Sequence, residues 1–202
     1  MSRYRSLSLL LFFMVSPAAL AAQDQRLTER LDRATAMGVQ TLVDSARAAG
    51  LPSEPLVQKA LEGSTMGATP DRIHVAVDAL FEQLVHARAA LGRDASEAEL
   101  TAGAGALRAG LAAVSLRQLH ELRSNTSLAV PIAVLTDLVA EGVSPDQATE
   151  AVLELARNGR SDGDFVALRK RVQAERRRAG PAGDDPLFRP APPPAPDPPA
   201  AR

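Results

Sequence analysis

The chain has 202 residues, a formal net charge of −1 and no cysteine, which excludes disulfides, thiolate metal sites and thiol catalysis together. A net charge this close to zero gives no global footprint of nucleic-acid binding. Aromatic residues make up 3% of the chain, which disfavours sites that stack sugars or single-stranded nucleic acid on aromatic faces.

The first 21 residues have the pattern of a secretory signal peptide. Arg3 and Arg5 supply positive charge, Leu7–Val15 is an apolar run, and Ala19-Leu20-Ala21 matches a cleavage site of small residues. The apolar run is shorter than the roughly 20 residues that a membrane-spanning helix needs. We therefore expect residues 1–21 to be removed. The mature protein would be exported to the periplasm or the medium, with no transmembrane segment of its own.

From residue 22 to residue 179 the spacing of apolar residues is helical almost throughout. Leu27, Leu31 and Ala34, for example, recur at i, i+4 and i+7, which predicts one face of a helix. Ala and Leu dominate, and both are strong helix formers. No convincing alternation with a period of two predicts a strand. We expect residues 22–179 to form one all-α domain, a small bundle of short helices.

Two nearly identical five-residue segments, 67–71 and 142–146, predict helix ends. In each, Gly can adopt the left-handed conformation that ends one helix, Thr or Ser caps the next helix, and Pro occupies its first position. These segments predict two helix–turn–helix units, near residues 50–90 and 128–175. Such Gly-x-Ser/Thr-Pro segments are either a common way to join short helices or the mark of an internal duplication, and the sequence leaves both open.

Four metal-ligand residue types follow one another at four-residue steps on one predicted helix. They are His74, Asp78, Glu82 and His86. Each step drifts by about 40° around a helix, so the outer two lie about 120° apart and one ion cannot reach all four. The stripe also lies opposite the apolar face of the same helix. We therefore expect a solvated charged face, and neither a metal site nor a cofactor.

A stretch rich in small residues follows a predicted capping box at Ser96 and Glu99. Gly103, Ala106 and Gly110 fall at i, i+3 and i+7, a stripe along which another backbone could approach closely. Each Gly costs a helix about 1 kcal/mol relative to Ala, so something should offset this cost. The stripe is interpreted either as close packing inside the domain or as a self-association face.

No catalytic set is predicted. No Gly-rich phosphate loop follows a strand, because no strand is predicted, and there is no His-Glu-x-x-His pair. Residues 158–164 resemble part of a calcium loop, but Arg160 replaces an expected oxygen ligand. A deep pocket lined by Arg117, His120 and Glu121 would instead favour a catalytic or ligand-binding site assembled from dispersed residues.

Cations crowd the end of the last predicted helix, where only Glu175 opposes them. They either complement the negative end of the helix dipole or contact an anionic envelope partner, such as lipid head groups or another protein. These six residues are Arg169, Lys170, Arg171, Arg176, Arg177 and Arg178.

The composition changes after the last helix. Nine of the 22 residues from Pro181 to Arg202 are proline. This composition cannot form a packed core and predicts a disordered, extended tail over residues 180–202. The tail is either a spacer or a docking segment for a partner.

The helical pattern is too generic to indicate a family. We expect an exported helical protein without catalytic activity, acting as an interaction or scaffold module in the cell envelope. Its partner would be an envelope protein or a second copy of itself, and no nucleic acid is expected. Two alternatives stay open. One is a periplasmic hydrolase or ligand-binding protein with a dispersed site. The other is a peripheral membrane protein in weak contact with anionic lipid through the basic helix end.

Export predicts a measurable change in mass. Protein recovered from the producing cell should lack about 21 or 22 N-terminal residues, because signal peptidase cleaves after a small-residue site. Intact-mass spectrometry measures this directly. A full-length chain retained in the cytosol would contradict the expectation.

Overall fold

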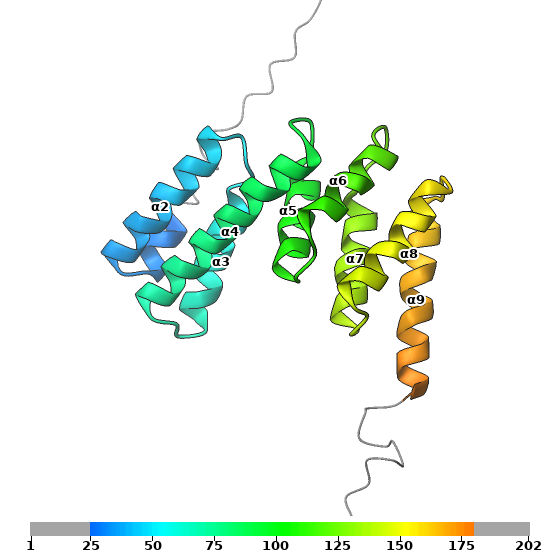
Figure 1. Cartoon of the computed structure of the whole chain (residues 1–202). Coiled ribbons are helices and arrows are strands. Elements are labelled where there is room, and N and C mark those ends of the chain that lie inside the picture. The colour runs from blue at the N-terminus through cyan, green and yellow to red at the C-terminus, as the bar shows by residue number, and fades with distance from the viewer. Residues whose placement is uncertain (1–24, 180–202) are drawn as a thin grey trace, which may run out of the picture. The chain divides into compact units, whose positions relative to one another are not determined.

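In a computed structural model, residues 25–179 are described. The predicted signal peptide and the predicted proline-rich tail lie outside this range. Every regular element within it is a helix, as the apolar spacing predicts. A short helical segment over residues 25–30 precedes the longer helices (Figure 1). These are α2 (Arg33–Ala48), α3 (Glu54–Thr65), α4 (Pro70–Leu91), α5 (Glu97–Arg108), α6 (Ala113–Leu122), α7 (Ala129–Ala140), α8 (Pro145–Arg157) and α9 (Asp162–Ala179).

Among the helices of residues 25–179, none is both long enough and apolar enough to cross a membrane.

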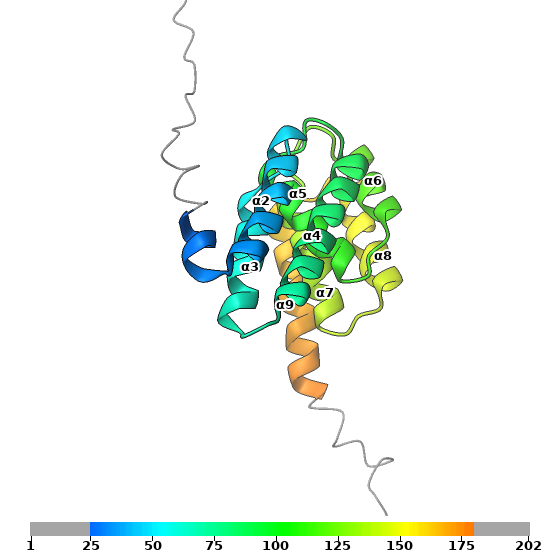
Figure 2. The same ribbon diagram turned by 90° about the vertical axis from the view of Figure 1, so that its left-hand side faces the viewer.

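The chain divides into two compact units, with the boundary between Leu107 and Arg108 at the end of α5. In the first unit α2, α3 and α4 pack against one another, and Figure 2 shows the 25–30 segment beside α2 and α3. In the second unit α7 packs against α8 and α9, and α6 packs against α8. The helix–turn–helix units predicted near 50–90 and 128–175 fall one in each compact unit.

The core of the first unit consists of small and medium aliphatic side chains. The buried residues of α2, α3 and α4 recur at three- and four-residue steps, so each helix turns one stripe inward. Leu27 is 1% exposed and attaches the 25–30 segment to this core. Core residues of these four elements include Leu27, Ala36, Val39, Val43, Ala46, Leu56, Val57, Ala60, Ile73, Val77, Leu84 and Ala87.

One glycine inside a helix has a packing reason. Gly63 lies in α3 and faces Ile73 of α4, where a Cβ on the glycine would lie 2.9 Å from the Ile73 Cγ1. The two helices therefore approach more closely than a residue with a side chain would allow. This close packing offsets the cost of about 1 kcal/mol that Gly imposes on a helix interior.

The first predicted helix face is interrupted. The Leu31 N–H donates to the Leu27 carbonyl, but a new helix begins directly after Asp32. The Asp32 carboxylate causes the break, because it accepts hydrogen bonds from the backbone N–H groups of Ala34 and Thr35 at 3.0 Å each. Ala34 is consequently exposed. The prediction that it shares one apolar helix face with Leu27 and Leu31 is therefore wrong.

Gly67 and Gly142 end α3 and α7 in a left-handed conformation, with φ of 69° and 84°. In each turn the next residue, Ala68 or Val143, donates its N–H to a carbonyl in the last turn of the preceding helix, at 2.9 and 3.0 Å. A residue with a Cβ is strained at such φ values, so glycine is required in both places.

The two turns differ at the start of the following helix. Ser144 Oγ accepts a hydrogen bond from the Gln147 N–H at 3.3 Å. Thr69 makes no side-chain capping bond, so the cap expected there is wrong. Both residues have extended backbone and are followed by Pro at the first helical position, where a missing N–H costs nothing.

Replacing Gly142 by Ala should destabilise the second unit by more than about 1 kcal/mol, because Ala resists the positive φ of this turn. The added Cβ would also lie 2.8 Å from Arg176 Nη2. Gly105 is a matched control, since it lies within α5 and a Cβ there would meet nothing within 4 Å. Gly105→Ala should instead stabilise by about 0.5–1 kcal/mol. Urea unfolding measures both changes, and shifts of the same sign would contradict this account.

Candidate functional site

The four metal-ligand residue types of α4 do not form a site. His74, Asp78, Glu82 and His86 are all exposed. Residues 25–179 contain no cluster of three or more His, Asp or Glu side chains that could hold an ion. The His74 ring lies against Gly38 of α2, where a Cβ added to the glycine would lie 3.3 Å from the ring Nε2. This contact gives His74 a role in packing.

Arg117, His120 and Glu121 are likewise not gathered into a pocket. Arg117 and Glu121 are exposed on α6, and His120 is half-buried. None of the three grooves described below is lined by any of them. The specific arrangement that would favour a dispersed catalytic site is therefore not present at these grooves.

The predicted small-residue stripe is not one continuous helix face. Gly103 and Ala106 lie in α5 and are buried. Gly110 lies beyond the end of α5, is exposed, and has a φ of 90°. It belongs to the turn before α6, because left-handed backbone ends a helix. The prediction that Gly110 lies on the same helix face as Gly103 and Ala106 is therefore wrong. The capping box at Ser96 and Glu99 does start α5, with both the Ser96 N–H and its hydroxyl donating to Glu99 Oε2 at 2.8 Å.

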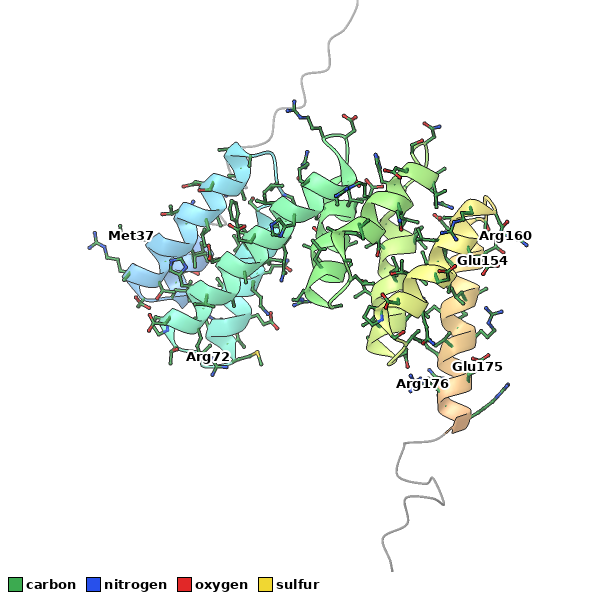
Figure 3. The ribbon with its side chains drawn as sticks, viewed as in Figure 1. Met37, Arg72, Glu154, Arg160, Glu175 and Arg176 are labelled. Atoms are coloured by element: carbon green, nitrogen blue, oxygen red, sulfur yellow. The ribbon has the colours of Figure 1, made fainter. Side chains whose placement is uncertain are left out.

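The six cations predicted near the end of the last helix lie on α9 and divide into two groups. Arg169 donates to Asp137 Oδ2 of α7 at 2.8 Å. The Arg176 guanidinium lies over Gly142 in the turn between α7 and α8 (Figure 3). The other four have exposed side chains and form no ion pair with a carboxylate of residues 25–179. These four, called here the outer cationic face, are Lys170, Arg171, Arg177 and Arg178.

An apolar groove of about 530 Å³ lies between the 25–30 segment and α2. Leu27 and Ala36 lie at its base and are 1% and 4% exposed. Met37 lines it as well, with 64% of its surface exposed (Figure 3). A second groove, of about 570 Å³, lies between α3 and α5 and includes Pro55, Glu97 and small residues. An exposed Met beside buried apolar side chains is typical of an adaptable contact surface.

A polar groove of about 350 Å³ lies in the second unit, between the α6–α7 turn and the α8–α9 turn. The Arg123 side chain lines it and is 10% exposed. Its Nη1 donates to the Arg160 carbonyl at 2.6 Å, and its Nη2 donates to Asp162 Oδ1 at 2.8 Å. The guanidinium also lies 5.0 Å from the centre of the Phe165 ring, close enough for a cation–π contact. One arginine thus joins two turns and the start of α9.

The first unit contains a similar arrangement around Arg88. Its Nη2 donates to the Gly50 carbonyl at 2.6 Å and its Nη1 to the Arg93 carbonyl at 2.7 Å. Arg88 therefore joins the α2–α3 turn to the α4–α5 turn. Sequence analysis did not identify Arg88 or Arg123, called here the two turn arginines. The only signal was an Arg close to the end of a helix, which helix-dipole effects already explain.

Residues 159–163 match the Gly-x-Ser-x-Gly pattern of hydrolase nucleophiles. Here the pattern follows a helix and not a strand. Ser161 Oγ donates to Asp164 Oδ2 at 2.8 Å, and Asp164 also accepts the Ser161 N–H at 2.9 Å. No histidine lines the adjacent groove. A hydroxyl held by a capping carboxylate, with no base beside it, lacks the activation that a nucleophile needs.

Two capping carboxylates have a pKa below the ordinary value of 3.8. For Asp164 the largest cause is the hydrogen bond from the Ser161 hydroxyl, followed by that from the Ser161 N–H. For Asp32 the largest cause is the hydrogen bond from the Thr35 hydroxyl, followed by backbone N–H donors. These donors stabilise the ionised form of each carboxylate.

Comparison with known proteins adds no further residue to these sites. No family model, no curated protein and no solved structure matches the chain. The candidate functional residues are therefore identified from the geometry of the chain itself.

Arg123→Met should destabilise the protein by about 2 kcal/mol, because it removes two charge-assisted hydrogen bonds and leaves the Arg160 carbonyl without its donor. Arg160→Met is the control. It changes an exposed side chain of the same turn and leaves that carbonyl in place, so its effect should stay within about 0.5 kcal/mol. Urea unfolding measures both variants. Equal losses would show that Arg123 does not join the turns as described.

Stability should fall when the capping carboxylates are protonated. Because the folded pKa of Asp164 and of Asp32 is lowered, their stabilisation is present above the unfolded pKa and is lost as the pH falls through the folded pKa. The melting temperature should therefore drop as the pH falls below about 4. The double variant Asp32→Asn with Asp164→Asn should show less of this drop. Asp78→Asn, which removes an exposed carboxylate of α4, should leave the drop unchanged.

Proposed function

We propose that the protein is an exported, non-catalytic helical module of the cell envelope that binds an envelope protein or a second copy of itself. The distribution of surface chemistry carries this proposal. His74 and His86 are exposed on separate turns of α4, and His120 is half-buried on α6. Exposed groups that suit binding are concentrated instead, at the groove beside Met37 and on the outer cationic face of α9.

The groove between the 25–30 segment and α2 supports binding of a protein partner. Interface cores are apolar and enriched in Met, and charged residues are depleted there. Leu27, Ala36 and Met37 provide such a centre, and Arg33 and Gln40 add polar groups to the lining. This combination resembles the apolar core and polar rim of a small interface.

The enzyme alternative receives no comparable support. The polar groove of the second unit is lined by Arg123, Asn125 and Ser161, among others. Its arginine donates to a carbonyl and a carboxylate, and the hydroxyl of its serine donates to Asp164. Both groups already have structural partners, so a hydrolytic function is the weaker hypothesis.

We further propose that the pairs α3–α4 and α7–α8 arose by internal duplication. Both first helices have 12 residues, and both turns contain a left-handed Gly and lead into a helix that begins with Pro. The second helices differ, with 22 residues in α4 and 13 in α8. The predicted tail over residues 180–202 would serve as a spacer or as a docking segment beyond this helical part.

Site-specific photo-cross-linking in the producing cell tests the interaction function. A benzophenone amino acid at position 37 should give one discrete adduct, either with an envelope protein or with a second copy of the chain. Position 66 is the control, because Met66 is 78% exposed and does not line the groove. It should give no such adduct. Absence of an adduct at position 37, or identical products at both positions, would argue against a binding role for this groove.

A further inference from the structure

We propose that the outer cationic face of α9 binds the phosphate head groups of an anionic membrane surface. This inference goes beyond the proposed function, because it assigns a lipid partner to a surface that the groove beside Met37 does not include. The four cations of this face are Lys170, Arg171, Arg177 and Arg178, all with exposed side chains.

The four cations share one side of the helix. At about 100° per residue, Lys170, Arg171, Arg177 and Arg178 fall within an arc of about 120°. Along the axis the face is about 12 Å long, at roughly 1.5 Å per residue. The exposed residues between these cations are Ala167 and Ala174.

The packed residues of α9 lie on the opposite side. Phe165 and Leu168 are buried, and Val172 is half-buried. At about 100° per residue, the centre of these three side chains lies about 150° around the helix from the middle of the cationic arc. Because α9 packs against α7 and α8, its outer cationic face points away from both of them.

The helix dipole does not explain the whole face. Its favourable effect on cations is confined to the last turn of a helix. Because α9 ends at Ala179, Lys170 and Arg171 lie about two turns before the end. These two cations therefore have neither a dipole role nor an ion pair within residues 25–179.

Acidic groups close to α9 do not neutralise the face. Asp137 of α7 is engaged by Arg169 on the packed side. Glu175 lies at the edge of the arc, about 40° beyond Arg171, and Figure 3 shows it on the side of α9 away from Arg176. The face therefore keeps an excess of positive charge.

The shape of the face favours a lipid surface over an inserted ligand. None of the three grooves is lined by a residue of α9, and the four exposed cations follow one side of that helix. Three of the four are Arg, whose guanidinium pairs with phosphate through two parallel hydrogen bonds. Clusters of four or more Lys and Arg on one helix are typical of contact with anionic head groups. The expected export brings the chain to a membrane surface.

The binding should be electrostatic and reversible. Amphipathic helices that insert into lipid use large apolar side chains, but only alanines lie between these cations, and the large apolar side chains of α9 are packed inward. Each cation is expected to raise the partition coefficient onto an anionic surface about fivefold, and added salt should reverse the binding.

Vesicle co-sedimentation of the water-soluble chain recovered from the producing cell tests the proposal. The probes are vesicles of phosphatidylcholine alone and of phosphatidylcholine with phosphatidylglycerol. The chain should bind the anionic vesicles, should not bind the neutral ones, and should be released by salt. The double variant Arg171→Gln with Arg178→Gln should bind the anionic vesicles roughly 25-fold more weakly.

The matched control is Arg72→Gln with Arg117→Gln. Both residues are exposed and lie on α4 and α6, so the control removes the same net charge from other surfaces. It should keep full binding. Thermal unfolding followed by circular dichroism should give both double variants the melting temperature of the parent chain. The reason is that none of the four substituted arginines makes an ion pair within residues 25–179.

Three results would overturn the proposal. The first is no binding to the anionic vesicles, and the second is an equal loss of binding in both variants, which would reflect net charge alone. The third is tighter binding to duplex DNA than to the vesicles at the same salt concentration, which would indicate a general polyanion site. If the chain does not bind the anionic vesicles but position 37 still gives its discrete adduct, only the proposal of lipid binding is wrong. If vesicle binding holds and that adduct is absent, the protein-binding function falls instead.

Discussion

Short helices are the constraint on which the rest of this structure depends. The helices α6, α7 and α8 have 10, 12 and 13 residues, and isolated helices of this length are marginal in water. Each one therefore relies on a neighbour that buries its apolar face. The turns decide which neighbour that is, because they fix the direction in which the next helix leaves. Left-handed glycines and side-chain caps therefore help to decide which apolar faces come together in the aliphatic core.

The two turn arginines extend this control beyond neighbouring segments of the chain. Arg88 reaches back to Gly50 over 38 residues, and Arg123 reaches forward to Arg160 over 37. Each donates to a carbonyl that would otherwise need water. Arginine suits this work, because its planar guanidinium holds two acceptors at once and stays charged. The three arginines of the outer cationic face, in turn, form no ion pair within residues 25–179.

The sequence predicted the helices and several of their ends, because these depend on local chemistry. The capping box at Ser96 and the left-handed Gly67 and Gly142 are set by residues within five positions of each other. The break at Asp32 was missed, although it too is local. The apolar spacing across it continued without interruption and outweighed one capping residue. Gly110 was placed on a helix face because composition alone does not show which glycine ends a helix.

The contacts of Arg123 could not be predicted, since they join residues that only the packed helices bring together. The division of the α9 cations has the same origin. Spacing places Arg169 and Arg171 only two residues apart, yet one pairs with Asp137 and the other is exposed. The sequence therefore indicated where positive charge collects, and the packing of α7 against α9 decided which part of that charge faces outward.

The contact between Gly63 and Ile73 has a consequence for how this protein can change. The two residues share a single small volume, since a Cβ at position 63 would lie 2.9 Å from the Ile73 Cγ1. A larger side chain at one position is tolerated only with a smaller side chain at the other. The changes in unfolding free energy caused by substitutions at these two positions should therefore not be additive. Chains descended from this one should therefore vary positions 63 and 73 together, and a larger residue at 63 should appear only beside a smaller one at 73.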